Sequence, residues 1–241
     1  MTQGKGAAAA GSPLTLITGL LVLCLGVLSW GYALFFATTE SHQGEVYRIL
    51  YLHVPSAFSA FFCSFLLLVF SIGGLKGQKS ALIYSKATAE LGLLYTILTL
   101  ATGSIWGKPT WGVWWTWDAR LTTTFILSLL YCGYLLLWSS MSAGPLRTKV
   151  CSVLGVLIAA DVPVIYKSVT WWRTLHQPPS LLREGGESTM SPEIKYLLLT
   201  CCVTGISVCI WLIWQRSVNL KLQETLDKAS YQHLREQESR Q

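Results

Sequence analysis

Six long apolar segments alternate with short polar connections along the chain, and this pattern predicts the fold. Each segment holds about 20 residues, enough for a helix to cross a hydrocarbon core of about 30 Å. The segments cover roughly residues 15–36, 54–74, 83–104, 121–139, 150–167 and 194–214. Lipid offers no hydrogen-bond partner for unpaired backbone N–H and C=O groups, so we expect all six segments to be α-helices. The sequence therefore predicts an all-α, polytopic membrane protein with six transmembrane helices, in a single domain over residues 1–241.

Composition and segment length support this prediction. Only 12% of the residues are charged, against about 25% in soluble domains. The first segment is longer than the core of a signal peptide, so we expect it to be retained as a span. All seven cysteines fall inside predicted spans, which favours apolar packing over a disulfide framework or a CxxC motif. The polar tail, residues 215–241, has helical spacing and mixed charges, typical of a solvated helix or, less often, of a partner contact.

The distribution of basic residues indicates how the protein is oriented in the membrane and does not favour a nucleic-acid partner. With the N-terminus cytoplasmic, eleven of the eighteen lysines and arginines lie on the inner side and seven on the outer side. The positive-inside rule then places both termini in the cytoplasm. Outer cations are still numerous, which suggests an anionic ligand on that face; they include Arg48, Lys108, Arg120, Lys167 and Arg173.

Three positions in or near the spans call for a local explanation. Pro55 suits the first turn of the second span, where its missing N–H costs nothing. Glu90 lies near the inner boundary, where we expect it to snorkel or to pair with Lys86 four residues earlier. Asp161 lies near membrane depth, where an ionised carboxylate needs a cationic partner such as Lys167 or Arg173.

The outer segment of residues 106–120 holds five of the eleven tryptophans. Clustered indoles suit either an aromatic belt at the lipid headgroups or the binding of an extended planar ligand. If the part after Pro109 forms a short helix capped by Thr110, one arc of about 100° carries several of these side chains. The residues on that arc are Trp111, Trp114, Trp115 and Asp118. Trp117 and Arg120 then point to the other side.

Two of the four histidines, His53 and His176, lie at the same outer boundary as this segment. A single interfacial histidine is usually a hydrogen-bonded loop residue. Two histidines beside the clustered indoles can instead supply both axial nitrogens of a haem, with the outer cations binding its propionates. Zinc and copper also bind histidine, but two nitrogens without further ligands make a poor site for a bare metal ion.

The residues in and around this segment resemble a known family. WGKPTWGVWWTWDARLTT (residues 106–123) is similar to the tryptophan-rich WWD signature of the haem-handling proteins of cytochrome c maturation. YRILYLHVP (residues 47–55) and VPVIYKSVTWWRTLHQP (residues 162–178) are similar to segments of its six-span CcmC members, the haem exporter protein C family, in the same order. The resemblance covers roughly residues 45–178. Asp161 and Arg173 depart from it, since both stand where the family pattern leads us to expect asparagine.

The resemblance implies a site that binds haem b transiently as cargo, with His53 and His176 as the axial iron ligands. It implies that the macrocycle is held by Trp111, Gly112, Trp114, Trp115, Trp117, Asp118 and Arg120. To these we add Arg48 as a candidate for the propionates. No nucleophile set lies on the outer face, so we expect no reaction catalysed by side chains.

The resemblance also implies partners and a location. In this family the protein works with the ABC-transporter subunits CcmA and CcmB and the small single-span subunit CcmD. It presents haem to the membrane-anchored chaperone CcmE, whose histidine becomes bonded to a haem vinyl group. We therefore expect a multi-pass protein of the bacterial inner membrane with its haem site facing the periplasm.

Two other classes of function compete with haem presentation. A b-type electron-transfer protein usually carries histidine pairs inside its spans, whereas no predicted span interior here contains one. A transporter that moves haem through its own bundle needs a polar path, and the span interiors offer few ionisable residues beyond Glu90 and Asp161.

Overall fold

The computed structural model describes residues 13–177 and 190–239, and every regular element in these ranges is helical. The helices are α2 (Pro13–Phe35), the 3-10 helix η1 (Glu45–Ile49), α3 (Leu50–Leu75), α4 (Lys79–Trp111), α5 (Ala119–Ser140), α6 (Pro145–Trp171) and α7 (Pro192–Glu238). Six of them are long and apolar enough to cross a membrane. The predicted all-α, six-span architecture is confirmed.

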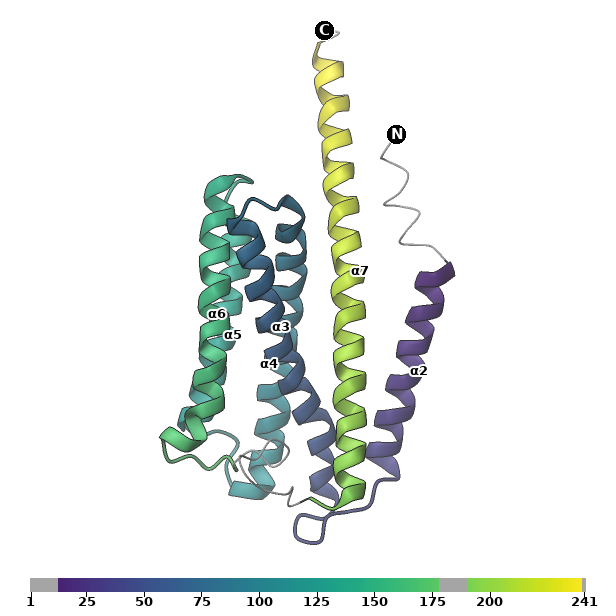
Figure 1. The fold of residues 1–241 in the computed structure, drawn as a ribbon, viewed down its shortest axis with the longest axis vertical. Helices are drawn as coiled ribbons and strands as arrows, with labels where there is room; N and C mark the ends of the chain where they lie inside the picture. The colour runs from purple at the N-terminus through teal and green to yellow at the C-terminus, as the bar shows by residue number, and fades with distance from the viewer. Residues whose placement is uncertain (1–12, 178–189, 240–241) are drawn as a thin grey trace.

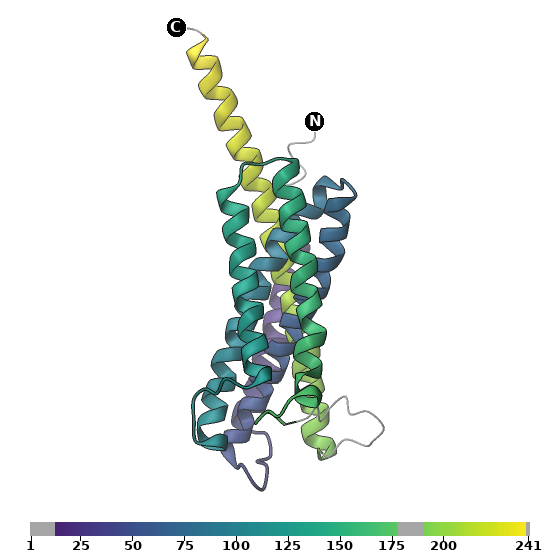
Figure 2. The same ribbon diagram turned by 90° about the vertical axis from the view of Figure 1, so that its left-hand side faces the viewer.

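Helix α3 lies at the centre of the bundle and packs against α4, α6 and α7. Helix α5 closes one side against α4 and α6, whereas α2 packs chiefly against α7 on the other side (Figure 1). The connections after α2, α4 and α6 gather at one end of the bundle, which we call the site end (Figures 1 and 2). The start of α2 and the end of α7 lie toward the opposite end.

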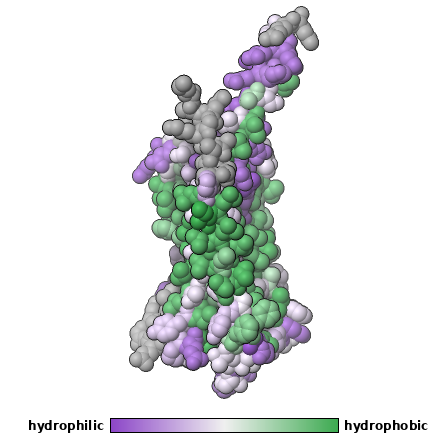
Figure 3. Space-filling model, turned by 90° about the vertical axis from the view of Figure 1, so that its right-hand side faces the viewer, coloured by the Kyte–Doolittle hydropathy of each residue, from purple (hydrophilic) through white to green (hydrophobic). Residues whose placement is uncertain are grey.

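The surface of the bundle matches a protein that crosses a bilayer. Figure 3 shows an apolar band around the middle of the face that α2 and α7 share, with polar side chains toward both ends. Helix α2 exposes long apolar side chains along its length, including Leu16, Leu20 and Leu23. Helix α7 continues beyond the other helices as one element to Glu238, so the predicted helical tail is confirmed (Figure 2).

The interior combines small residues with a few buried tyrosines. In lipid, helices associate through close packing and interhelical hydrogen bonds. The hydrophobic effect does not drive them together, because lipid tails are as apolar as the protein interior. The fully buried Tyr131 of α5 accordingly shares a hydrogen bond of 2.9 Å between its hydroxyl and that of Ser64 on α3. The cysteines are all free, and Cys63 packs against Cys209 in the core with 3.4 Å between their sulfurs.

Pro55 is not in the first turn of its helix, so that prediction is wrong. Helix α3 begins at Leu50, directly after the 3-10 turn, and Pro55 is therefore inside it. A proline in this position leaves the carbonyl four residues earlier without its usual helical donor. That carbonyl belongs to Tyr51 and accepts a hydrogen bond of 2.8 Å from the Trp30 indole of α2. The proline thus creates an acceptor that joins α2 to α3.

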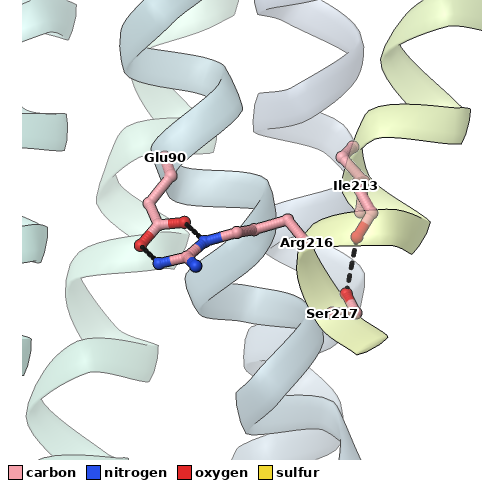
Figure 4. A network of polar contacts seen from close by, with 4 residues as sticks. All are labelled: Glu90, Ile213, Arg216 and Ser217. Atoms are coloured by element: carbon pink, nitrogen blue, oxygen red, sulfur yellow. Dashed lines mark hydrogen bonds and ion pairs between the residues drawn. The ribbon is translucent and has the colours of Figure 1, made fainter. Parts of the chain in front are cut away.

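Glu90 pairs with Arg216 of α7, not with Lys86 as predicted. The carboxylate accepts two hydrogen bonds from the guanidinium, from Nε at 2.5 Å and from Nη2 at 2.9 Å (Figure 4). Lys86 instead lies over the Trp138 ring, 5.9 Å from its centroid. The planar guanidinium matches the carboxylate with two bonds, which an ammonium group cannot do. This pair joins α4 to α7 away from the site end.

In the described part of the chain no ion pair joins Asp161 of α6 to Lys167 or Arg173, the partners that we expected for it. Its Oδ2 atom is buried and has no hydrogen-bond partner among the described residues. The Arg173 side chain lies beyond the end of α6, in an exposed connection. Part of the outer connection between α6 and α7, residues 178–189, lies outside the described residues, as do residues 1–12 and 240–241.

Candidate functional site

The tryptophan-rich segment does not form the separate short helix that we predicted. Helix α4 runs through Pro109 to Trp111, and the Thr110 hydroxyl donates to the Trp106 carbonyl at 2.7 Å as an ordinary interior residue. Gly112 ends the helix with φ +80, a left-handed conformation that favours glycine. Residues 113–117 then form an irregular loop to α5. The predicted helical arc therefore does not exist.

Asp118, at the end of this loop, accepts hydrogen bonds from two backbone amides. It caps α5, because its Oδ1 accepts a hydrogen bond of 2.9 Å from the Leu121 amide. Its Oδ2 accepts a second one of 3.2 Å from the Leu175 amide in the connection after α6. The carboxylate thus holds together the tryptophan-rich loop and the segment that carries His176. Asp118 is not among the residues that line the cavity described next.

A cavity lies between α3, α4 and α5 at the site end. Its empty volume is about 900 Å³, part of it open to solvent. Its deeper wall is apolar and includes Ala57, Ala60, Phe61 and Leu127. Its outer part contains the two histidines, Trp111, Trp115 and Arg120.

His53 of α3 and His176 of the connection after α6 meet at this cavity. Their ring centroids are 6.4 Å apart and their planes make an angle of 39°. Trp106 stands edge-on to His53 at 5.8 Å, and Trp111 is tilted against His176 at 6.4 Å. The structure therefore brings together the two outer histidines that the sequence singled out, with an indole beside each.

The surroundings of His176 favour its neutral form. Burial lowers the pKa of this imidazole below its usual value, and the nearby Arg120 cation lowers it further. The hydrogen bond to the Gln177 carbonyl and the Asp118 carboxylate oppose this shift without cancelling it. A neutral imidazole keeps a free nitrogen lone pair, which is the form that can bind a metal.

Two side chains at the cavity, Trp115 and Arg120, have N–H groups available to a ligand. Trp115 lines it, and its buried indole N–H has no hydrogen-bond partner among the described residues. Arg120, which we expected to point away, also lines it. One of its Nη atoms donates to the Ile165 carbonyl at 3.1 Å, and it forms no ion pair with a described carboxylate. A polyanionic ligand could accept from both groups.

Other residues that we predicted for the site lie outside the cavity lining. The Trp114 and Trp117 side chains are 58% and 74% exposed. The Arg48 guanidinium donates to the Leu34 and Ala37 carbonyls at the end of α2, at 2.6 and 3.0 Å. Helix carbonyls at this end attract a cation, so Arg48 is used as a helix cap. Gly112 shapes the backbone and has open space around it.

Sequence reasoning missed three residues of α4 that face His53. Trp106 was counted in the tryptophan-rich segment but given no role, and Thr102 and Gly103 were not considered. The Thr102 hydroxyl lies 3.1 Å from His53 Nδ1. A Cβ on Gly103 would come within 2.9 Å of the His53 ring. Their spacing of three to four residues along one helix is a signal that could have identified them.

Comparison with known proteins identifies the family of the chain. The profile of the family described as CcmC, heme exporter protein C, matches residues 5–232. The chain belongs to this family. It is 38% identical over 203 residues to heme exporter protein C of Haemophilus influenzae, covering 83% of this chain and 80% of the relative. It is 36% identical over 199 residues to heme exporter protein C of Escherichia coli K12, covering 80% of both.

The similar proteins also include one that is named as mitochondrial. A putative cytochrome c biosynthesis ccmC-like mitochondrial protein of Arabidopsis thaliana is 36% identical over 199 residues, covering 79% of this chain and 72% of the relative. The matched range of the CcmC family contains all six long helices up to the exposed end of α7. Membership therefore applies to the whole bundle and not to the tryptophan-rich segment alone.

Proposed function

We propose that the cavity binds haem b as a cargo, with His53 and His176 as the two axial ligands of its iron. The distance between their rings carries this proposal. Two metal–nitrogen bonds of about 2.0–2.1 Å, with each ring centre about 1 Å behind its nitrogen, put the centroids of two axial imidazoles roughly 6 Å apart. The observed separation is 6.4 Å. The 39° between the planes is compatible, since axial rings can rotate about their common axis.

The other groups at the cavity suit the rest of a haem. Indoles and an apolar deeper wall match the macrocycle, and the Arg120 guanidinium and the Trp115 N–H suit carboxylate groups. The described residues contain no group of three or more His, Cys, Asp or Glu that could hold a bare metal ion. The donor set thus favours a metal that arrives with four equatorial ligands of its own.

We further propose that haem held here is presented to the chaperone CcmE, beside CcmA, CcmB and CcmD. Charge distribution supports the orientation in which both termini are cytoplasmic and the site end faces the periplasm of the bacterial inner membrane. The protein's part is to bind and orient the haem, while bond formation belongs to the porphyrin and to the histidine of the chaperone. Relatives named for heme export and for cytochrome c biosynthesis support this assignment.

The ligand assignment is tested by titrating ferric haem into the detergent-purified apo-protein. We expect the visible spectrum of a six-coordinate, low-spin haem, and its loss in His53→Ala and in His176→Ala. His42→Ala is the matched control, because His42 lies in the exposed connection before η1. A low-spin spectrum that survives both site substitutions would show that these histidines are not the ligands.

Presentation is tested separately from binding. Haem-loaded protein is mixed with CcmE, and covalent attachment of haem to the chaperone is measured. We expect attachment with the haem-loaded wild-type protein and none with the apo-protein. Haem that binds with the expected spectrum but never reaches CcmE would favour an electron-transfer role instead.

A further inference from the structure

Helix α4 forms a cradle around the His53 ring with four residues on one face. Thr99, Thr102, Gly103 and Trp106 are spaced by three, four and seven positions from the first, so they lie on the same side of the helix. Trp106 supports the ring edge-on at 5.8 Å. Thr102 and Gly103 each make a closer approach to the imidazole, and their two contacts have different consequences.

The Thr102 hydroxyl, together with a backbone hydrogen bond to Thr99, indicates where the proton on His53 lies. Its oxygen is 2.6 Å from the Leu98 carbonyl, which can only accept, so the single hydroxyl proton is donated there. The same oxygen is 3.1 Å from His53 Nδ1 and has only lone pairs left to offer. His53 Nδ1 must therefore carry the hydrogen of this bond. The neutral ring then has an unprotonated Nε2.

At His176 a backbone carbonyl selects the same tautomer. Its Nδ1 is 2.8 Å from the Gln177 carbonyl oxygen, which again can only accept. His176 is thus also protonated at Nδ1, with its Nε2 lone pair free. The two rings at the cavity share one tautomer, although one is set by a side chain and the other by the main chain.

Gly103 leaves the space in which the His53 ring lies. A Cβ at this position would be 2.9 Å from His53 Cε1 and 3.4 Å from Nδ1. The first distance is shorter than real Cβ contacts allow, so an alanine here would displace the ring. The displaced ring would also lose its hydrogen-bond geometry with Thr102, since the two residues are adjacent on α4.

We propose that Thr102 and Gly103 are positioning residues for His53. Thr102 holds the imidazole as the Nδ1–H tautomer with Nε2 free to bind iron, and Gly103 provides the room for that orientation. This inference rests on the proposed haem site. A hydrogen bond from the distal nitrogen of a histidine ligand fixes its orientation and raises its basicity, and its loss typically costs about 10- to 100-fold in affinity for the metal.

The first test needs no haem. Apo-protein labelled with ¹⁵N at histidine is studied by solid-state NMR, and the His53 signals are assigned by their absence in His53→Ala. We expect a neutral ring with Nδ1 protonated, and loss of this single tautomer in Thr102→Val. A ring protonated at Nε2 in the wild type, or an unchanged tautomer in Thr102→Val, would overturn the role of Thr102 whatever the protein binds.

The second test titrates ferric haem into the purified variants. Thr102→Val and Gly103→Ala are each expected to weaken binding at least about tenfold. Thr102→Val should also raise the midpoint potential of the bound haem, because a less basic ligand stabilises ferric iron less. Thr102→Ser, which keeps the hydroxyl, should restore both properties. A purely structural role for Thr102 would not move the potential.

Matched controls are available on other helices. Thr200→Val removes a hydroxyl that only bonds to the carbonyl four residues earlier, and Gly31→Ala adds a Cβ where nothing lies within 4 Å. Both should bind haem as the wild type does. If wild-type protein gives the low-spin spectrum and Thr102→Val and Gly103→Ala match it in affinity and potential, the positioning role is wrong while the haem site stands. If wild-type protein gives no low-spin spectrum, the haem site itself fails and this role falls with it.

Discussion

The Asp118 carboxylate accepts a hydrogen bond from the Leu175 amide at 3.2 Å, across the gap between the tryptophan-rich loop and the connection after α6. Its other oxygen caps α5 through the Leu121 amide. We expected Asp118 to face the ligand. It instead holds the segment next to His176 in place. This relationship leads to a direct test of how the site is held.

Asp118→Asn should weaken haem binding by about tenfold while leaving the free energy of unfolding nearly unchanged. Asparagine is an equally good helix cap, but the two amides use different carboxylate oxygens, and the NH₂ group that replaces one of them cannot accept a hydrogen bond. The measurements are a haem titration and thermal unfolding of the same samples. Ser191→Ala is the control, because it removes the cap of α7 without touching the site. Equal haem affinity in Asp118→Asn and the wild type would contradict this role.

Trp115 and Trp117 should differ although they are two residues apart. Trp115→Phe keeps a ring at the cavity wall but removes the unpartnered N–H, so we expect a loss of about 1 kcal/mol in haem binding, or about fivefold. Trp117→Phe changes a side chain that is 74% exposed and should leave the affinity within error. Titration of both variants with ferric haem checks this. The reverse order of effects would show that the bound haem lies elsewhere in the segment.

Ligation by His176 should persist below the pH at which an ordinary histidine is lost as a ligand. Its pKa is lowered from 6.5 by burial and by Arg120, so the neutral, metal-binding form remains as the pH falls through 6.5. We expect a constant low-spin spectrum from pH 8 to below 6.5. Arg120→Gln removes one of these causes and should move the acid transition to higher pH. A transition that stays in place in Arg120→Gln would exclude this electrostatic coupling.

The pair of Glu90 and Arg216 should stabilise the packing of α7 on the core. Glu90→Gln or Arg216→Gln alone should reduce the free energy of unfolding in detergent by about 1–2 kcal/mol. This is less than for a fully buried pair, because the Glu90 and Arg216 side chains are 24% and 38% exposed. A double-mutant cycle should give a coupling energy of about 1 kcal/mol.

A second ion pair provides the control for that cycle. Glu224→Gln breaks the bond to Lys228 on the exposed part of α7 and should cost less than about 0.5 kcal/mol. Strict additivity of the Glu90 and Arg216 variants would mean that the contact in Figure 4 contributes nothing to stability.

Some errors in the sequence reasoning share one cause, the use of local rules where a distant segment decides. Glu90 was expected either to snorkel or to pair with Lys86, four residues away on one helix, but α7 brings Arg216 to it with a better geometry. Arg48 was assigned to the ligand because it is a cation at the outer boundary. The nearby carbonyls at the end of α2 accept its hydrogen bonds instead.

The sequence by itself determined the six spans, since each depends only on the length and polarity of one segment in lipid. It also determined that His53 and His176 share an end of the bundle, because the number of spans between them is even. Only the tertiary structure decided which groups reach the cavity. That choice depends on where α4 ends, on the loop that Asp118 fixes to Leu175, and on the approach of Thr102 and Gly103 to His53. These contacts join different helices, and the hydropathy of a single segment carries no information about them.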